Sequence, residues 1–248
     1  MAAGKYLIED FPVICKNNHQ QRGNHLFYPG AIILMDKPKG WSSFDVVKYV
    51  RSRVPVKKVG HAGTLDPLAT GLLICCCGKA TKTISQFHQL QKVYSAKIKF
   101  GASTPSYDAA TEVDEKAEWK HINENELREL LVSQFTGIIM QKPPIYSALR
   151  VNGKRLYKYA RKGQKVEIAE RPVTIYDIQI DSFNLPEVTL TITCGKGTYV
   201  RSIAHDLGLA MNSRAHLFDL RRTKTGTYDA ENAFTPDEID DYLNEDIK

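Results

Sequence analysis

The chain has 248 residues, of which 42% are hydrophobic and 25% charged, and its formal net charge is +6. This composition is typical of a globular protein with one large or two small domains and argues against a disordered chain. No apolar run approaches the roughly 20 residues of a membrane helix, so we expect no membrane partner. The N-terminal residues include acids where a targeting segment would be basic or apolar, which favours a cytoplasmic protein.

Charge is distributed unevenly along the chain. Residues 229–248 carry a net charge of −7, whereas residues 1–228 carry +13. A basic body favours a polyanionic partner, because Lys and Arg side chains that neutralise phosphates release counterions. A basic surface that is simply solvated is the alternative at this point.

The five cysteines are Cys15, the run Cys75 to Cys77, and Cys194. Neighbouring residues of a strand point to opposite faces, so three cysteines in succession suit neither a zinc site nor a disulfide framework. We expect them to be small buried residues of a strand in a reducing compartment. The sequence predicts no metal site and no cofactor.

The first predicted elements are a strand and a helix. Residues 30–35 form an apolar run typical of a buried strand. The helix is expected to begin near Ser42, because Asp45 follows at the spacing of a capping box. Its apolar positions at helical spacing are Phe44, Val47 and Val50.

Between these elements and the next strand lies GHAGTLDPLATGLL, residues 60–73. Pro67 disfavours a helical conformation at Asp66 and lacks an N–H group. Gly60, Gly63 and Gly71 tolerate close approach of the backbone. The pattern favours a loop that presents one carboxylate to a ligand, with an ordinary turn as the alternative.

The middle of the chain continues to alternate strands and helices. Residues 94–100 alternate apolar and polar side chains, which predicts a strand with one solvated face. Asn123 and Glu126 predict the start of a helix. Further strands are expected around residues 173–180 and 188–194.

Residues 138–163 are the most basic and aromatic part of the chain. A turn at Gly153 is expected before a short helix around residues 154–161. Lys154, Arg155 and Lys158 interleave with tyrosines there, as in segments that contact phosphates and pack against bases or sugars. The alternative is a helix with a solvated basic face and tyrosines anchored in the core.

The segment GKGTYVRS leads into a further predicted helix, with Thr198 as a possible cap. Arg201 falls in the first turns of this helix, where the helix dipole does not favour a cation. A partner carboxylate or phosphate would explain its position.

Six motifs occur in the order found in the TruB family of tRNA pseudouridine synthases, which the chain resembles from about Ala31 to Gly226. They are DKPKGWSS, GHAGTLDPLATGLL, KVYSAKIKFG, PPIYSALRVNGKRLYKYAR, GKGTYVRSIAHDLG and LRRTKTG. The chain departs from the family pattern at Arg150, where lysine is expected, and at Thr64, where alanine is common. It is also too short to hold the PUA domain that many members carry.

The resemblance implies an α+β pseudouridine synthase fold, with a mixed, mainly antiparallel sheet flanked by helices. We expect an N-terminal extension over residues 1–30 and a catalytic domain over 31–228, with a basic thumb-like insertion at about 138–170. Residues 229–248 would form a short acidic segment without a full PUA domain. From its residues alone, this segment predicts a capped amphipathic helix that docks through Ile239, Tyr242 and Leu243.

The activity implied by the resemblance is isomerisation of uridine 55 to pseudouridine in the T-loop of tRNA. This reaction breaks the N1 glycosidic bond, turns the base and joins C5 to the sugar, and a carboxylate can divide it into easier steps. By resemblance Asp66 is that carboxylate. Attack at C1′, addition to C6 and formation of a glycal all remain open at this point.

Other positions match family residues of known role. Arg201 resembles the arginine that pairs with the catalytic aspartate and keeps it ionised. Tyr94 resembles the tyrosine that stacks on the target uracil, and Leu220 the apolar residue that closes the pocket. His61 resembles the histidine that fills the space left by the flipped base. Further expected contacts to substrate or RNA are Lys37, Tyr199, Arg222, Lys154, Arg155 and Lys158.

The expected partner is the T-arm of tRNA, bound by a monomer. Two alternatives stay open: a tRNA-binding or tRNA-folding module without chemistry, and a synthase of the same fold acting on another RNA. The presence of both Asp66 and Arg201 disfavours the first alternative, because a pure binding module need not keep them.

Overall fold

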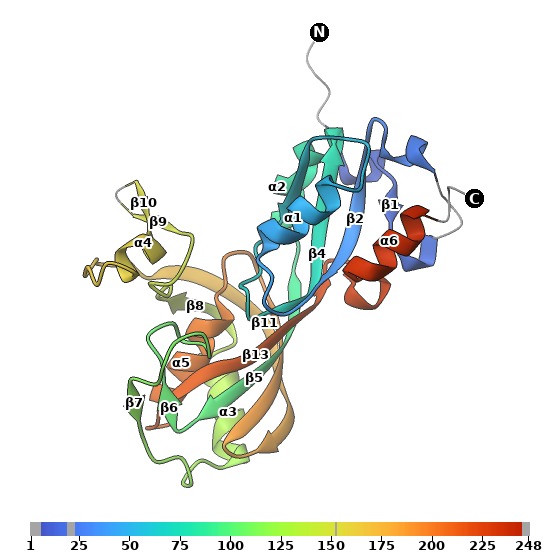
Figure 1. Cartoon of the computed structure of the whole chain (residues 1–248). Coiled ribbons are helices and arrows are strands. Elements are labelled where there is room, and N and C mark those ends of the chain that lie inside the picture. Colours follow the sequence, from blue (N-terminus) through green and yellow to red (C-terminus); the bar gives the residue numbers. More distant parts are fainter. Residues whose placement is uncertain (1–5, 19–22, 152, 245–248) are drawn as a thin grey trace. The chain divides into compact units, whose positions relative to one another are not determined.

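The computed structural model describes residues 6–18, 23–151 and 153–244 (Figure 1). The chain divides into two compact units, a terminal unit of Met1–Val93 with Arg221–Lys248 and a central unit of Tyr94–Leu220. Two strands, β5 (Lys92–Phe100) and β13 (Ala215–Thr225), run from one unit into the other. Within the described residues, no helix is long and apolar enough to cross a membrane.

The terminal unit is built on a mixed sheet. Its strands are β1 (Val13–Ile14), β2 (Gly30–Lys37), β3 (Val59–Ala62), β4 (Thr70–Gly78), the end of β13, and β14 (Tyr228–Asp229). The order is β1-β2-β4-β13, with β3 on β4 and β14 on β13. The pairs β1/β2 and β4/β13 are parallel, and the pairs of β4 with β2 and β3 are antiparallel.

The cysteine run lies in β4, as predicted. Cys75, Cys76 and Cys77 are all fully buried. Because side chains alternate along a strand, Cys75 and Cys77 join one apolar cluster and Cys76 joins another on the opposite face. The sheet of the terminal unit therefore has a hydrophobic core on each side.

Helices α1 (Ser43–Arg51) and α2 (Ile84–Gln89) belong to the terminal unit. The predicted start of α1 is confirmed, since Ser42 and Asp45 form a capping box. The predicted apolar face is wrong at one position, because Phe44 is 53% exposed. The buried face is centred on Val46, Val47 and Val50, and at 3.6 residues per turn Phe44 lies beyond its edge.

Helix α6 (Pro236–Asn244) confirms the helix predicted near the C-terminus. Thr235 and Glu238 exchange hydrogen bonds at its start, in the manner of a capping box. Ile239 and Tyr242 are buried in the cluster that also contains the apolar face of α1, and Leu243 packs against it. Residues 245–248, which complete the predicted acidic segment, lie outside the described residues.

The sheet of the central unit has the order β13-β5-β12-β11-β8. Its further strands are β8 (Gly137–Gln141), β11 (Arg171–Asn184) and β12 (Glu187–Cys194), and the pairs β11/β12 and β11/β8 are antiparallel. Two small antiparallel pairs join β6 (Ala102–Ser103) to β7 (Glu115–Lys116) and β9 (Arg150–Val151) to β10 (Lys154–Arg155). The mainly antiparallel character of the fold is as predicted.

Helices α3 (Glu124–Gln134), α4 (Leu156–Ala160) and α5 (Val200–Ala210) complete the central unit. Asn123 caps α3 as predicted, by accepting a hydrogen bond from the Glu126 N–H. The possible cap of α5 is wrong, because the Thr198 hydroxyl donates to the Gly195 carbonyl and Tyr199 is the N-cap residue. Short 3-10 helices cover Ile8–Asp10, Lys16–Asn18, Asn24–Phe27, Lys79–Thr83 and Ala230–Asn232.

Residues 142–170 connect β8 to β11 in the central unit, and we call them the basic insertion. They carry β9, β10 and α4, which stand apart from that sheet in Figure 1. The helix is shorter than predicted, because Lys154 and Arg155 pair with β9 instead of starting it. The hairpin and helix together present the basic side chains.

Candidate active site

Asp66 lies in the irregular loop that joins β3 to β4 in the terminal unit. Its side chain is half-buried, while Thr64 and Pro67 are exposed. The Asp66 carbonyl accepts a hydrogen bond of 3.0 Å from the Ala69 N–H, which closes a turn after the carboxylate. Residues 63–69 therefore form the predicted loop, and it carries a single carboxylate, that of Asp66.

The backbone on both sides of Asp66 is bound to the start of α1 or to the segment just before it. The Ser43 hydroxyl donates to the Leu65 carbonyl at 3.0 Å and accepts from the Leu65 N–H at 2.8 Å. The Pro67 carbonyl accepts from the Gly40 N–H at 2.8 Å. These contacts connect the motif DKPKGWSS to the motif that holds Asp66.

Lys37 is fully buried beneath this loop. Its ammonium donates to the carbonyls of Pro38 at 2.9 Å and Trp41 at 2.6 Å, and lies 3.5 Å from that of Pro67. Burial lowers the pKa of Lys37 to about 8. The negative charge of Asp66 raises this pKa, and the positive charge of Arg222 lowers it. The Lys37 ammonium and the Asp66 carboxylate therefore stabilise each other's charge.

Arg222 is 1% exposed and binds backbone carbonyls before and after Asp66 in the chain. Its guanidinium donates to the Leu72 carbonyl at 2.7 Å and to the Gly63 carbonyl at 3.1 Å. Lys37 and Arg222 were expected to support the site and its RNA. Their burial and their backbone partners favour support of the loop over contact with RNA.

His61 lies on β3, shortly before the loop, and its side chain is half-buried. Burial lowers the pKa of His61, and the positive charges of Arg222 and His88 lower it further. A hydrogen bond with the Gly63 backbone raises this pKa, but by less. The imidazole is therefore neutral near pH 7. A neutral planar ring of this kind can stack on bases without a charge of its own.

A second contact between distant motifs was not predicted. The Arg221 guanidinium binds the Asp36 carboxylate through both oxygens, at 3.0 and 2.6 Å. This bidentate pair joins DKPKG to LRRT, beside Lys37 and Arg222. The sequence could have indicated this pair, because Asp36 directly precedes Lys37 and Arg221 directly precedes Arg222.

Arg201 lies on α5 in the central unit and is 4% exposed. Its guanidinium donates to the carbonyls of Ser106 at 3.1 Å and Tyr146 at 2.9 Å, and lies 3.5 Å from the Asp108 carboxylate. A carboxylate or a phosphate beside Arg201 was expected from its place near a helix start. Asp108 supplies a carboxylate there, and it was not among the predicted site residues.

Asp108 is itself held by its own loop. Its carboxylate accepts from the Ser106 hydroxyl at 2.6 Å and from the Ala110 N–H at 3.0 Å, in an Asx-turn arrangement. Tyr107 has a φ of 63° and stacks on His205 of α5 with ring centroids 3.8 Å apart. The polar run from Ser103 to Thr111 was the signal that could have identified this loop.

Three further predicted residues also lie in the central unit. Tyr199 exchanges backbone hydrogen bonds with the Gln141 side chain, at 2.8 and 3.1 Å, and its ring lies under the Arg171 guanidinium. Tyr94 is half-buried on β5, and Leu220 is buried on β13.

The basic insertion exposes its cations to solvent. Lys154, Arg155 and Lys158 are all exposed, as are Arg161 and Lys162. Tyr157 is half-buried, with the Arg161 guanidinium over its ring, and the Tyr159 hydroxyl donates to the Val151 carbonyl. The tyrosines support the hairpin and helix, and the cations are available to a ligand.

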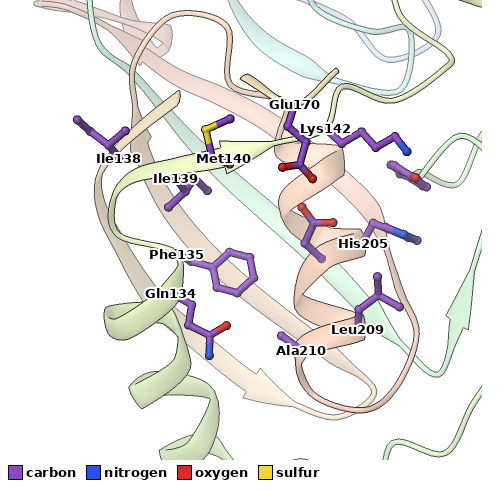
Figure 2. Close-up of a pocket in the computed structure, with 12 residues that line it drawn as sticks. Gln134, Phe135, Ile138, Ile139, Met140, Lys142, Glu170, His205, Leu209 and Ala210 are labelled. Carbon is purple, nitrogen blue, oxygen red and sulfur yellow. The ribbon is translucent and has the colours of Figure 1, made fainter. Parts of the chain in front are cut away.

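The central unit also holds a cavity of about 820 Å³ lined by residues of α3, β8 and α5. Figure 2 shows Phe135, Ile139 and the carboxylate of Glu170 around it. Burial, with the negative charge of Glu170, raises the pKa of Asp206 in this cavity to about 6. Within the described part of the chain, none of the predicted site residues lines this cavity.

Comparison with known families gives two matches that are contiguous along the chain. Residues 51–200 match the N-terminal domain of the TruB family of pseudouridylate synthases. Residues 201–247 match the C-terminal domain of tRNA pseudouridylate synthase B.

Curated relatives are similar over most of their length. The tRNA pseudouridine synthase B of Flavobacterium johnsoniae is 50% identical over 214 residues, which cover 84% of this chain and 93% of the relative. The tRNA pseudouridine synthase B of Parabacteroides distasonis is 42% identical over 227 residues, covering 89% and 96%.

Solved structures confirm the predicted fold. A chain from the crystal structure of a Cbf5-Nop10-Gar1 complex has a TM-score of 0.70 and 27% identity, covering 94% of this chain and 59% of that one. A chain from an H/ACA RNP bound to a substrate RNA containing 2'-deoxyuridine has a TM-score of 0.68 and 25% identity, covering 96% and 60%. The present chain thus spans about 60% of the length of each of these chains.

Proposed function

Because the chain belongs to the TruB family and isomerises uridine to pseudouridine in tRNA, we propose that its target is uridine 55 of the T-loop and that Asp66 is the catalytic carboxylate. The matched family and the six ordered motifs support this proposal. The residues around Asp66 supply its physical basis.

The reaction is an isomerisation, so every atom of the base is kept. The bond from N1 to C1′ breaks, the bond from C5 to C1′ forms, a proton leaves C5 and N1 gains one. Attack on C1′, addition to C6 and proton removal that gives a glycal all begin from an ionised carboxylate beside the nucleotide. A site for this chemistry must therefore hold one carboxylate in its charged form and in a fixed direction.

The observation that carries the proposal is the way the Asp66 loop is held. Lys37, Ser43 and Arg222 are buried, and each binds backbone carbonyls of the loop or its ends, while the Asp66 side chain itself is half-buried. The positive charge of Lys37 favours the ionised form of Asp66. An ordinary surface turn would need neither buried cations nor backbone bonds on both sides of its carboxylate.

The other roles rest on the family resemblance. Tyr94 would stack on the uracil, Arg201 would stabilise the ionised carboxylate, and Leu220 would close the pocket. His61 would fill the space left by the flipped base, which its neutral imidazole suits.

The exposed cations of the basic insertion suit contact with the phosphates of the T-arm. We propose that a monomer binds this arm through the catalytic domain alone, and that it does so in the cytoplasm. Tyr199, held by Gln141, would contact the bound RNA from the central unit.

Site-resolved mapping of modified RNA tests the proposed target. A tRNA transcript and an isolated T-arm hairpin should each gain one pseudouridine at position 55, at rates within a few fold. The same transcript with cytidine at position 55 should gain none. Modification at another uridine, with position 55 untouched, would contradict the proposal and favour a synthase acting on another RNA.

A further inference from the structure

The two serines at the start of α1 have different partners. Ser42 is the N-cap residue, and its hydroxyl and backbone N–H are both engaged with Asp45 in the capping box. Ser43 is 2% exposed, and its hydroxyl turns to Leu65 instead. Because Ser42 already caps the helix, the Ser43 hydroxyl is not needed to begin α1.

We propose that Ser43 is a positioning residue for Asp66, a role that rests on the proposed function of Asp66. The Ser43 hydroxyl binds both backbone groups of Leu65, the residue directly before Asp66. It thereby fixes the peptide plane from which the Asp66 side chain departs.

The geometry of the loop gives this contact its effect. A side chain leaves the backbone in a direction set by the two rigid peptide planes on either side of its Cα. The plane before Asp66 contains the Leu65 carbonyl, which accepts from Ser43. The plane after it contains the Asp66 carbonyl, which accepts from the Ala69 N–H. Both planes that orient Asp66 are therefore tied.

A hydroxyl suits this position because it both donates and accepts. Leu65 as a whole is 3% exposed, and in an irregular loop its N–H and C=O have no strand partner. Without the hydroxyl, each of these two buried groups would lack a hydrogen bond, and an unpaired polar group is costly to keep buried. The loop would then rotate to find water, and the Asp66 carboxylate would turn with it.

The test compares Ser43→Ala with a matched change elsewhere in the terminal unit. Thr83 is also fully buried, and its hydroxyl donates to the Ala80 carbonyl at 2.9 Å, away from the Asp66 loop. Thr83→Val removes that bond and nearly preserves side-chain shape. Single-turnover rates would be measured at saturating T-arm hairpin, well below the unfolding temperature of each variant, together with the Kd of the hairpin.

We expect Ser43→Ala to lower the single-turnover rate about 10- to 100-fold, since small misplacement of a reacting group has effects of this size. The Kd should stay within a few fold, and Thr83→Val should keep the wild-type rate. Ser43→Thr, which retains a hydroxyl, should recover most of the rate, whereas Ser43→Cys should not. A wild-type rate in both Ser43→Ala and Ser43→Cys would overturn the inference, as would an equal loss in Thr83→Val.

Amide hydrogen exchange gives a second readout that does not depend on activity. The Leu65 amide should exchange faster in Ser43→Ala, with α1 and β4 unchanged, and unchanged exchange would also overturn the inference. Failure of the proposed function has a different signature, because Asp66→Asn would then keep its turnover. An inactive Asp66→Asn together with a fully active Ser43→Ala would count against Ser43 alone.

Discussion

Gly71 lies opposite Arg222 where β4 and β13 pair in parallel, and a Cβ on Gly71 would clash with the Arg222 carbonyl oxygen. The same arginine sends its guanidinium back to the carbonyls of Leu72 and Gly63. Strand pairing and support of the Asp66 loop therefore depend on one residue. Gly71 also has a φ of 97°, a backbone conformation that residues other than glycine rarely adopt.

Gly71→Ala should destabilise the protein for two reasons, backbone strain and a clash with the Arg222 backbone. Gly40 is the matched control, because its φ of 86° is similar and no atom lies within 4 Å of an added Cβ. Gly71→Ala should lower the free energy of unfolding by about 1–3 kcal/mol more than Gly40→Ala, the usual cost of overpacking. Urea denaturation measures both, and equal losses would show that β4 and β13 can separate without cost.

The α6 helix should contribute stability and not RNA recognition. Ile239 is 1% exposed in the cluster shared with α1, so Ile239→Ala should lower the free energy of unfolding by about 2–5 kcal/mol. Asp241→Ala, on the exposed side of the same helix, should change it little. Binding of the T-arm hairpin should stay within a few fold in both variants, and a selective loss of binding in folded Ile239→Ala would assign α6 a role in recognition.

Replacing Lys154, Arg155 and Lys158 together by Ala should weaken RNA binding and flatten its dependence on salt, by up to roughly one unit of slope per lost phosphate contact. The control removes the same charge from exposed positions elsewhere in the central unit, Lys116, Lys120 and Arg128. It should leave the slope nearly unchanged. If the first variant bound normally and only its single-turnover rate fell, the basic insertion would not be a phosphate contact.

Asp206 should make stability depend on pH. Its pKa in the folded protein, about 6, lies above its ordinary value of 3.8, so the folded state favours the protonated acid. The resulting stabilisation is complete below about pH 3.8 and is lost as the pH rises through about 6. Asp206→Asn, which is always neutral, should therefore have a higher Tm than the wild type at pH 8, with a gap that closes toward pH 4.

The cause of this shift can be checked in the same experiment. Glu170→Gln removes the neighbouring negative charge and leaves the burial of Asp206, so the pKa of Asp206 in the folded protein should fall but stay above 3.8. In a Glu170→Gln background, the Tm gap at pH 8 should therefore be smaller and should be complete at a lower pH. A Tm difference between Asp206→Asn and the wild type that is constant from pH 4 to pH 8 would contradict the assignment.

Local sequence signals predicted the elements well. The caps of α1, α3 and α6 each involve residues three positions apart, and those contacts form whenever the helix does. The cysteine run was identified as a buried strand because three consecutive side chains could share no site on one face. The error at Phe44 arose because an i, i+3 pattern alone does not fix which side of a helix faces the core.

The contacts that hold the candidate site depend on distant parts of the chain. Ser43 and Leu65 are 22 positions apart, and Asp36 and Arg221 are 185 apart. The second pair follows from the register of β2, β4 and β13, and the first from the packing of α1 against the loop. No local pattern specifies either arrangement. The same limit applies to Asp108, whose partner Arg201 lies on a helix much later in the chain.

The central claim is that the Asp66 carboxylate carries the chemistry, and the single-turnover rate of Asp66→Asn tests it most directly. Asparagine keeps the size and much of the hydrogen bonding of the side chain but is neither charged nor a competent nucleophile. With T-arm hairpin at saturation, we predict no pseudouridine over incubations long enough for many wild-type turnovers, together with a hairpin Kd within a few fold of wild type. Pseudouridine formation at a rate near that of the wild type, in a preparation free of wild-type enzyme, would contradict the account.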